Sequence, residues 1–138
     1  MAKDKYHMLV RNLLEADGWQ VTHDPYFLML GKRRGFIDLG AERILLGAEK
    51  KGEKIAIEVK SFLGLSDVDQ FEDALGQYLL YKPALQEKEP ERTLYLALPI
   101  SFYNSLFDDS YFQKIAQLYD LKMLIFDEKS EIISEWKK

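Results

Sequence analysis

The sequence has no cysteine, few glycines and prolines, and no long apolar run. The lack of cysteine excludes disulfides, thiolate metal sites and cysteine nucleophiles, so any metal must be held by oxygen or imidazole ligands. Residues 1–6 are polar and lead into an amphipathic stretch, a pattern that predicts neither a signal peptide nor a membrane span. We therefore expect a soluble, cytoplasmic protein that does not contact a membrane.

The sequence also has fewer basic than acidic residues, 19 against 23, and its net charge is -4 at pH 7. Proteins that coat nucleic acid through bulk electrostatics usually carry a basic face. Any contact with DNA is therefore expected to be local. Two short basic runs are candidates, although such runs are also typical of solvated turns: Lys32-Arg33-Arg34, and Lys50, Lys51 with Lys54.

What is present suits one globular domain over residues 1–138, with 47% hydrophobic residues. Apolar residues recur at helical spacing over residues 5–17, and Gly18 follows where a helix C-cap favours positive φ. Three extended segments come next and are expected to form a meander; they cover residues 19–30, 36–46 and 54–61.

The second half of the chain predicts further helices and strands. Ser66 is the expected N-cap of an amphipathic helix that ends near Lys82, before Pro83. A strand buried on both faces follows at residues 93–98, and the strand, helix, strand order favours a parallel crossover. The remaining segments predict two helices and a closing hairpin, at residues 102–107, 111–118, 122–126 and 132–136.

Charged residues interrupt two of the apolar strands. The strand period places Glu58 and Lys60 on one face of residues 55–61, and Asp38 breaks the apolar segment 36–39 one hairpin away. Neighbouring strands can bring the two carboxylates together, and Mg²⁺ prefers such oxygen ligands. The alternative is a solvent-exposed Glu58 and Lys60, with Asp38 accepting backbone hydrogen bonds at a strand edge.

The element order αβββαβ, with Asp38 on the second strand and Glu58-Val59-Lys60 on the third, resembles the PD-(D/E)XK nuclease superfamily. The resemblance implies a restriction-endonuclease-like α/β fold with a central mixed sheet. It makes Asp38, Glu58 and the carbonyl of Val59 ligands of Mg²⁺ or Mn²⁺, and Lys60 the catalytic base or water-positioning group. The motif's proline is replaced by Ile37, which lowers the specificity of the match.

Two further positions extend this resemblance. Gln77 and Tyr81, spaced i and i+4 on the helix after the third strand, are similar to the QxxxY motif of RecB-type and Cas4-type nucleases, where these side chains border the active site. Superfamily members often complete the site from the first helix, which here offers His7 and Glu15. His7 is preferred as a metal ligand because it lies at the edge of the apolar stripe, although a structural, partly buried histidine is the competing interpretation.

A resemblance to the XisH family, the fdxN element excision controlling factors of cyanobacteria, covers nearly the whole chain. It is carried by segments such as Asp17-Gly-Trp19, Thr22-His-Asp-Pro25, Asp38-Leu-Gly-Ala-Glu42, Gly52 to Leu63, Leu75-Gly-Gln-Tyr78 and Leu94-Tyr-Leu-Ala97. It implies a role in excision of a DNA element, alongside a site-specific recombinase and a companion protein, XisI.

Two functions follow from these resemblances. The first is a metal-dependent deoxyribonuclease, in which a homodimer or a partner supplies the rest of the DNA-binding surface. The second is a non-catalytic accessory protein that uses the nuclease fold to bind XisI or a recombinase, since fold alone does not imply activity. An open cleft with an unlocked Lys60 would favour the first, whereas a Lys60 held by Glu58 under a covering loop would favour the second.

Overall fold

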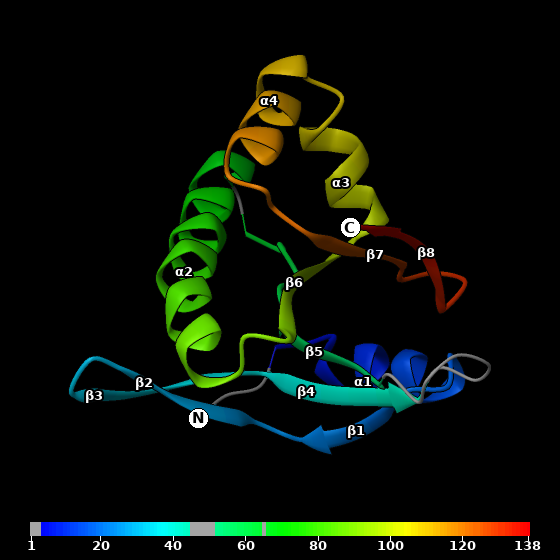
Figure 1. The fold of residues 1–138 in the computed structure, drawn as a ribbon. Coiled ribbons are helices and arrows are strands. Elements are labelled where there is room, and N and C mark those ends of the chain that lie inside the picture. The colour runs from blue at the N-terminus through cyan, green and yellow to red at the C-terminus, as the bar shows by residue number, and fades with distance from the viewer. Residues whose placement is uncertain (1–3, 45–51, 65) are drawn as a thin grey trace.

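The computed structural model describes residues 4–44, 52–64 and 66–138. Its elements follow one another along the chain as drawn in Figure 1. The first half holds α1 (His7–Ala16), β1 (Gln20–His23), β2 (Tyr26–Leu30), β3 (Arg33–Ile37), β4 (Leu39–Ile44) and β5 (Gly52–Val59). The second half holds α2 (Asp67–Lys88), β6 (Arg92–Pro99), α3 (Ile100–Leu106), α4 (Ser110–Leu118), β7 (Met123–Asp127) and β8 (Ile132–Lys137).

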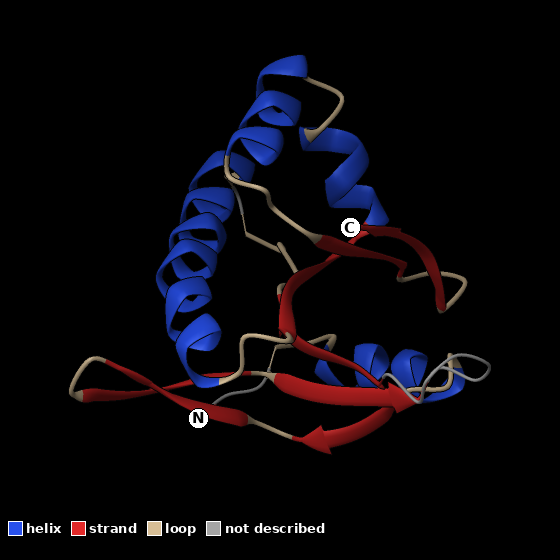
Figure 2. Cartoon of the chain, in the orientation of Figure 1, coloured by secondary structure: helices blue, strands red, loops and turns tan. Residues whose placement is uncertain are grey.

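A mixed sheet of six strands forms the centre of the molecule, in the order β1-β4-β5-β6-β7-β8. β5, β6 and β7 are parallel neighbours, whereas β1, β4 and β8 are attached antiparallel. Helices flank this sheet, as Figure 2 shows. The predicted α/β class with a central mixed sheet is confirmed, as are the parallel crossover, the two C-terminal helices and the closing hairpin.

Each face of the sheet has its own hydrophobic core. One core holds α2 and α3 through side chains such as Phe71, Tyr78 and Phe102, and the other holds α1 through Val10 and Leu14. β5 serves both cores, because successive side chains of a strand point to opposite faces. Ala56 belongs to the first core, and Ile55, Ile57 and Val59 belong to the second. β5 is therefore a central strand, buried on both faces.

The predicted meander of three strands is confirmed in its pairing but not in the continuity of its strands. Residues 19–30 pair with residues 36–46 through β1 with β4 and β2 with β3, and β4 pairs in turn with β5, all antiparallel. The first segment is divided between His23 and Tyr26 and the second at Asp38, so that β2 and β3 form a separate two-stranded sheet. The last two residues of the segment 36–46 lie outside the described ones.

The predicted end of α2 before Pro83 is also wrong, since the helix continues to Lys88. Proline inside a helix removes one hydrogen bond and crowds the preceding turn. Burial of Leu85, which is 1% exposed, offsets this cost, because the last turn of α2 packs into the first core. At the other end, the predicted N-cap is confirmed: Ser66 Oγ accepts a 3.2 Å hydrogen bond from the backbone N–H of Asp69.

The expected features at the first helix are confirmed as well. Gly18 has a φ of +94° directly after α1, and Trp19 is 4% exposed in the second core. None of the described helices is long and apolar enough to cross a membrane.

Candidate active site

Asp38 and Glu58 meet where the hairpin joins the central sheet. Asp38 occupies the break between β3 and β4, and Glu58 is the penultimate residue of β5. The backbone N–H of Val59 donates to Asp38 Oδ2 over 2.8 Å, and the backbone N–H of Asp38 donates to Glu58 Oε1 over 3.2 Å. This reciprocal exchange fixes the two carboxyl groups side by side.

The two carboxyl groups line a cavity of about 220 Å³. Its walls come from the chain before α1, from β3, from the end of β5 and from α2. The lining residues are Asp4, Phe36, Asp38, Glu58, Val59, Lys60 and Gln77. The structure thus brings five of the candidate site residues together around one cavity: Asp38, Glu58, Val59, Lys60 and Gln77.

Glu58 is held in an environment that disfavours its charge. Its burial, with only 5% of the residue exposed, is the largest cause, followed by the negative charge of Asp38 and a side-chain hydrogen bond with Asp38. Together these raise the pKa of Glu58 to about 9, against a partial opposing effect of Lys60. Near neutral pH the carboxyl pair therefore shares a proton, and a cation that binds both carboxylates must displace it.

Lys60 follows β5 and remains accessible. Its backbone N–H donates to the carbonyl of Ala97 over 3.0 Å, which anchors the residue to β6. Its Nζ lies 3.9 Å from Glu58 Oε2, and the side chain is 33% exposed. At 3.9 Å this contact is too long for a hydrogen bond, so it does not hold the ammonium group in place. Lys60 is therefore free to interact with a ligand that enters the cavity.

Tyr81 and His7 lie outside this cavity. The hydroxyl of Tyr81 instead approaches the hairpin of β2 and β3 at Gly35. A Cβ atom added to Gly35 would lie 3.5 Å from this hydroxyl. His7 is buried, and its Nε2 lies 2.7 Å from Asp24 Oδ1. These contacts match a structural role for His7 in joining α1 to the residues before β2. Glu15 is exposed and pairs with Arg11 on the helix surface.

Asp4 is a residue that the sequence reasoning missed. Its Oδ1 accepts from the backbone N–H of Tyr6 over 3.0 Å, and its Oδ2 accepts from the backbone N–H of Ser61 over 2.9 Å. Asp4 thereby ties the start of α1 to the segment after Lys60 and adds a third carboxylate to the cavity wall. The available signal was its position just ahead of a helix, where aspartate commonly accepts local backbone hydrogen bonds.

The ligand set offered by this cavity suits a hard cation with open positions. In the part of the chain that the structure describes, no group of three or more His, Asp or Glu side chains is arranged to hold a metal. Mg²⁺ is commonly held by one or two carboxylates, with water and substrate oxygens completing its octahedron. The Asp38 and Glu58 pair fits that pattern, and it differs from a closed structural metal site.

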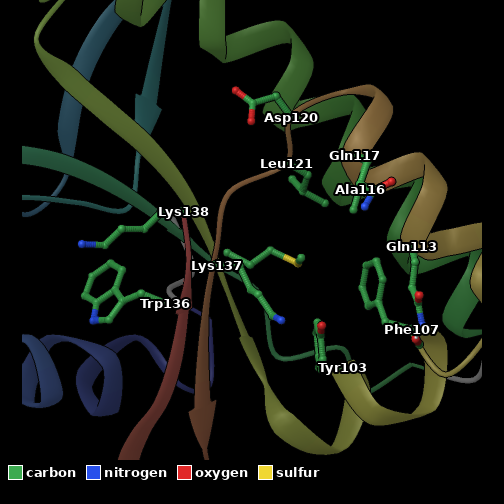
Figure 3. Close-up of a pocket in the computed structure, with 11 residues that line it drawn as sticks. Tyr103, Phe107, Gln113, Ala116, Gln117, Asp120, Leu121, Trp136, Lys137 and Lys138 are labelled. Atoms are coloured by element: carbon green, nitrogen blue, oxygen red, sulfur yellow. Dashed lines mark hydrogen bonds between the residues drawn. The ribbon is translucent and has the colours of Figure 1, made fainter.

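A larger cavity of about 540 Å³ lies elsewhere, between α3, α4, β7 and β8. Figure 3 shows its mixture of aromatic, amide and basic side chains around Tyr103 and Lys137. The carboxylate among its lining residues is Asp120, which is 3.5 Å from both Lys82 and Lys122. It lacks a carboxylate pair, so the smaller cavity is the candidate active site.

Of the remaining charged candidates, Lys54 is surrounded by three carboxylates, those of Glu42, Glu89 and Glu91, at 3.5 to 3.6 Å. This arrangement makes Lys54 part of a surface ion network. Lys50 and Lys51 lie outside the described residues.

The fold and the site define a mixed α/β domain with a paired-carboxylate and lysine cavity at the end of a central parallel strand. The family model described as XisH protein matches residues 1–134, and the chain belongs to the XisH family. Among curated proteins, none matches the chain significantly.

Two solved structures are similar over nearly the whole chain. An XisH family protein from Nostoc punctiforme PCC 73102 is 39% identical, with 98% of this chain and 100% of that one covered and a TM-score of 0.84. An fdxN element excision controlling factor protein from Anabaena variabilis is 37% identical, with 96% and 98% covered and a TM-score of 0.85. Both relatives come from cyanobacteria.

Proposed function

We propose that this protein is an excision controlling factor for a DNA element and that it cleaves phosphodiester bonds with a divalent metal at the cavity of Asp38, Glu58 and Lys60. The relative from Anabaena variabilis carries the first half of the proposal, because its description is that of such a factor. A carboxyl pair of the kind used by PD-(D/E)XK nucleases, next to an accessible lysine, supports the second half.

The single observation that carries the catalytic half is the buried carboxyl pair. A protein gains nothing in stability from a Glu58 whose pKa is raised to about 9, because ionising it inside the fold costs free energy. Perturbed groups of this kind concentrate at functional sites. A divalent cation would compensate both carboxylates and remove the cost.

Each residue then has a distinct role. Asp38 and Glu58, with the carbonyl of Val59, would hold Mg²⁺ or Mn²⁺. The bound ion supplies polarisation of the phosphodiester and a lowered pKa of the attacking water. Lys60 orients that water or offsets charge on the phosphate oxygens as the bond breaks. Gln77 contributes an amide from the α2 wall of the cavity.

The test is a plasmid cleavage assay with Mg²⁺ or Mn²⁺. Lys60→Met keeps the aliphatic stem and both carboxylates, so we expect it to retain metal binding and to lose cleavage by a factor of about 100 or more. Lys114→Met, on the exposed surface of α4, is the matched control and should cleave like the wild type. Equal cleavage by Lys60→Met and the wild type would exclude Lys60 from the reaction.

A second candidate is a non-catalytic accessory protein that binds XisI or a recombinase. One observation favours it: the backbone N–H groups of Asp38 and Val59 already satisfy one oxygen of each carboxyl group, so the pair is stable without a metal. The two candidates differ in the cleavage assay. A wild type that binds no metal and cuts no DNA, alone or with XisI, would support the accessory function.

A further inference from the structure

We propose that the hairpin of β2 and β3, residues 26–37 and hereafter the arm, is the surface through which this protein grips duplex DNA and leads one strand to the Asp38 and Glu58 cavity. The inference deepens the proposed function, on which it rests, by naming the element that holds the substrate. The arm would recognise its partner by the negatively charged phosphate backbone and by the wide groove that this backbone borders.

The arm is a two-stranded ribbon that leaves the main body. Figure 1 shows it extending to the left, beyond the lower end of α2, and Figure 2 shows its strands joined by a turn. Its inner face is anchored: Tyr26 and Leu28 are buried in the first core, and Gly35 lies against Leu30 and Tyr81. The arm is therefore a fixed projection rather than a loose loop.

The outer face of the arm combines apolar surface with a cation. Phe27 and Met29 are 40% and 53% exposed, and they lie opposite Phe36 and Arg34 in the register of the ribbon. The Arg34 guanidinium lies 3.9 Å from the centroid of the Phe27 ring. This stacking orders the guanidinium of a side chain that stays exposed, an arrangement suited to binding a phosphate.

The same face continues into the candidate active site. Alternate residues of a strand share a face, so Arg34 and Phe36 point the same way. Phe36 lines the cavity, and Asp38 stands at the end of β3, four residues from Arg34. At about 3.3 Å per residue this places the basic end of the arm roughly 13 Å along the chain from the carboxyl pair. A DNA strand lying on the arm would therefore reach the cavity within a few nucleotides.

The tip of the arm concentrates positive charge on an acidic protein. Lys32, Arg33 and Arg34, hereafter the arm tip, are all exposed, whereas the net charge of the chain is -4. Among the described residues, none of the three has a carboxylate within ion-pair distance, in contrast to Lys54 and Arg43. Three cations without acidic neighbours are complementary to a phosphate backbone, which releases counterions when they bind.

The shape of the arm favours duplex DNA. The major groove is about 12 Å wide and admits a two-stranded ribbon. Strand pairs are an established means of entering a groove, and the apolar side chains Phe27 and Met29 would face the base edges while the arm tip contacts phosphates.

The test measures binding of the full chain to a short fluorescent DNA duplex by anisotropy, in EDTA and again in Ca²⁺, over a series of salt concentrations. The arm variant carries Lys32→Ala, Arg33→Ala and Arg34→Ala. The control variant carries Lys114→Ala, Lys129→Ala and Lys138→Ala, which remove the same net charge from α4, from the turn between β7 and β8 and from the C-terminus. Figure 1 shows α4 and that turn well away from the arm.

We expect the arm variant to bind at least about tenfold more weakly, and the slope of log K against log salt to decrease by about 2.7, or about 0.9 for each lost phosphate contact. The control variant should stay within about twofold of the wild type. Thermal unfolding should be the same for all three proteins, because the substituted side chains are exposed.

Two results would overturn the inference: a wild type that does not bind the duplex in either buffer, or an arm variant that matches the control in affinity and salt slope. A failure of the catalytic proposal can be distinguished from these two results. An Asp38→Asn variant that binds DNA through the arm but cuts nothing, together with a wild type that also cuts nothing, would refute cleavage and leave the arm intact.

Discussion

Replacing Glu58 with glutamine should stabilise the protein above about pH 5, the more so the higher the pH. Glu58 has a pKa of about 9 in the fold against an ordinary value of 4.5, so between these two pH values the folded state holds a proton that the unfolded state has released. Folding stability from this residue is therefore highest below about pH 4.5 and falls as the pH rises toward 9. Glutamine removes the titration while its amide can still donate to Asp38.

The magnitude follows from the size of the shift. Each pKa unit is worth about 1.4 kcal/mol, and pH 7 lies 2.5 units above the ordinary value, so Glu58 costs about 3 kcal/mol at pH 7. Glu58→Gln should be more stable than the wild type by about that amount at pH 7, and by almost nothing at pH 4.5. For a chain of this size the gain corresponds to roughly 10 °C in the melting temperature.

The assay is urea unfolding followed by circular dichroism, between pH 5 and pH 8 and without metal. The quantity of interest is the difference in unfolding free energy between Glu58→Gln and the wild type at each pH, because other titrating groups cancel in it. Glu72→Gln, on the exposed face of α2, is the matched control. A difference for Glu58→Gln that stays flat from pH 5 to pH 8 would refute the reasoning about the carboxyl pair.

Three further predictions concern the two ends of α2, one end at its junction with the arm and β6 and the other at its N-cap. Although burial opposes the shift, hydrogen bonds from Arg92 and Tyr26 lower the pKa of Glu89 to about 2, so the stability that Glu89 contributes is lost as the pH falls from about 4.5 toward 2. In Glu89→Gln the melting temperature should therefore depend less on pH between about 4.5 and 2, as measured by thermal unfolding at a series of pH values. A pH dependence equal to that of the wild type would contradict this prediction. Arg92 is buried and donates to the carbonyls of Ala41 and Ile55, so Arg92→Met should cost about 3 kcal/mol in urea unfolding; a cost below about 1 kcal/mol would mean that the network is dispensable. Ser66→Ala removes the N-cap of α2 and should cost about 1 kcal/mol, whereas a neutral result would show that the cap is not formed in solution.

Local patterns were sufficient for most elements and for the carboxyl pair. The spacing in residues 55–61 put Glu58 and Lys60 on one face, and the structure places both at the same cavity. The same alternation left open a solvated face, because period two does not distinguish a surface strand from a central one. Burial of Glu58 follows from the helix α2 and the neighbouring strands, which are distant in sequence.

The features that the sequence did not indicate all depend on long-range contacts. Pro83 is tolerated because Leu85 is buried and because Glu89, just after the helix, is bonded to Tyr26 and Arg92. The arm separates from the main sheet at the breaks between β1 and β2 and at Asp38, although the strands on both sides of the breaks pair with each other. Asp4 reaches Ser61, 57 positions away, to form part of the cavity wall. Propensity and spacing describe neighbours along the chain and contain no information about such partners.

Calorimetric titration of the wild type with Mn²⁺ or Mg²⁺, beside Asp38→Ala and Glu58→Ala, tests the central claim most directly. The account predicts binding by the wild type, loss of binding in both variants, and release of about one proton per ion at pH 7, because Glu58 must ionise to bind. Binding that survives both substitutions, or a wild type that binds neither ion, would contradict a metal site at the Asp38 and Glu58 pair.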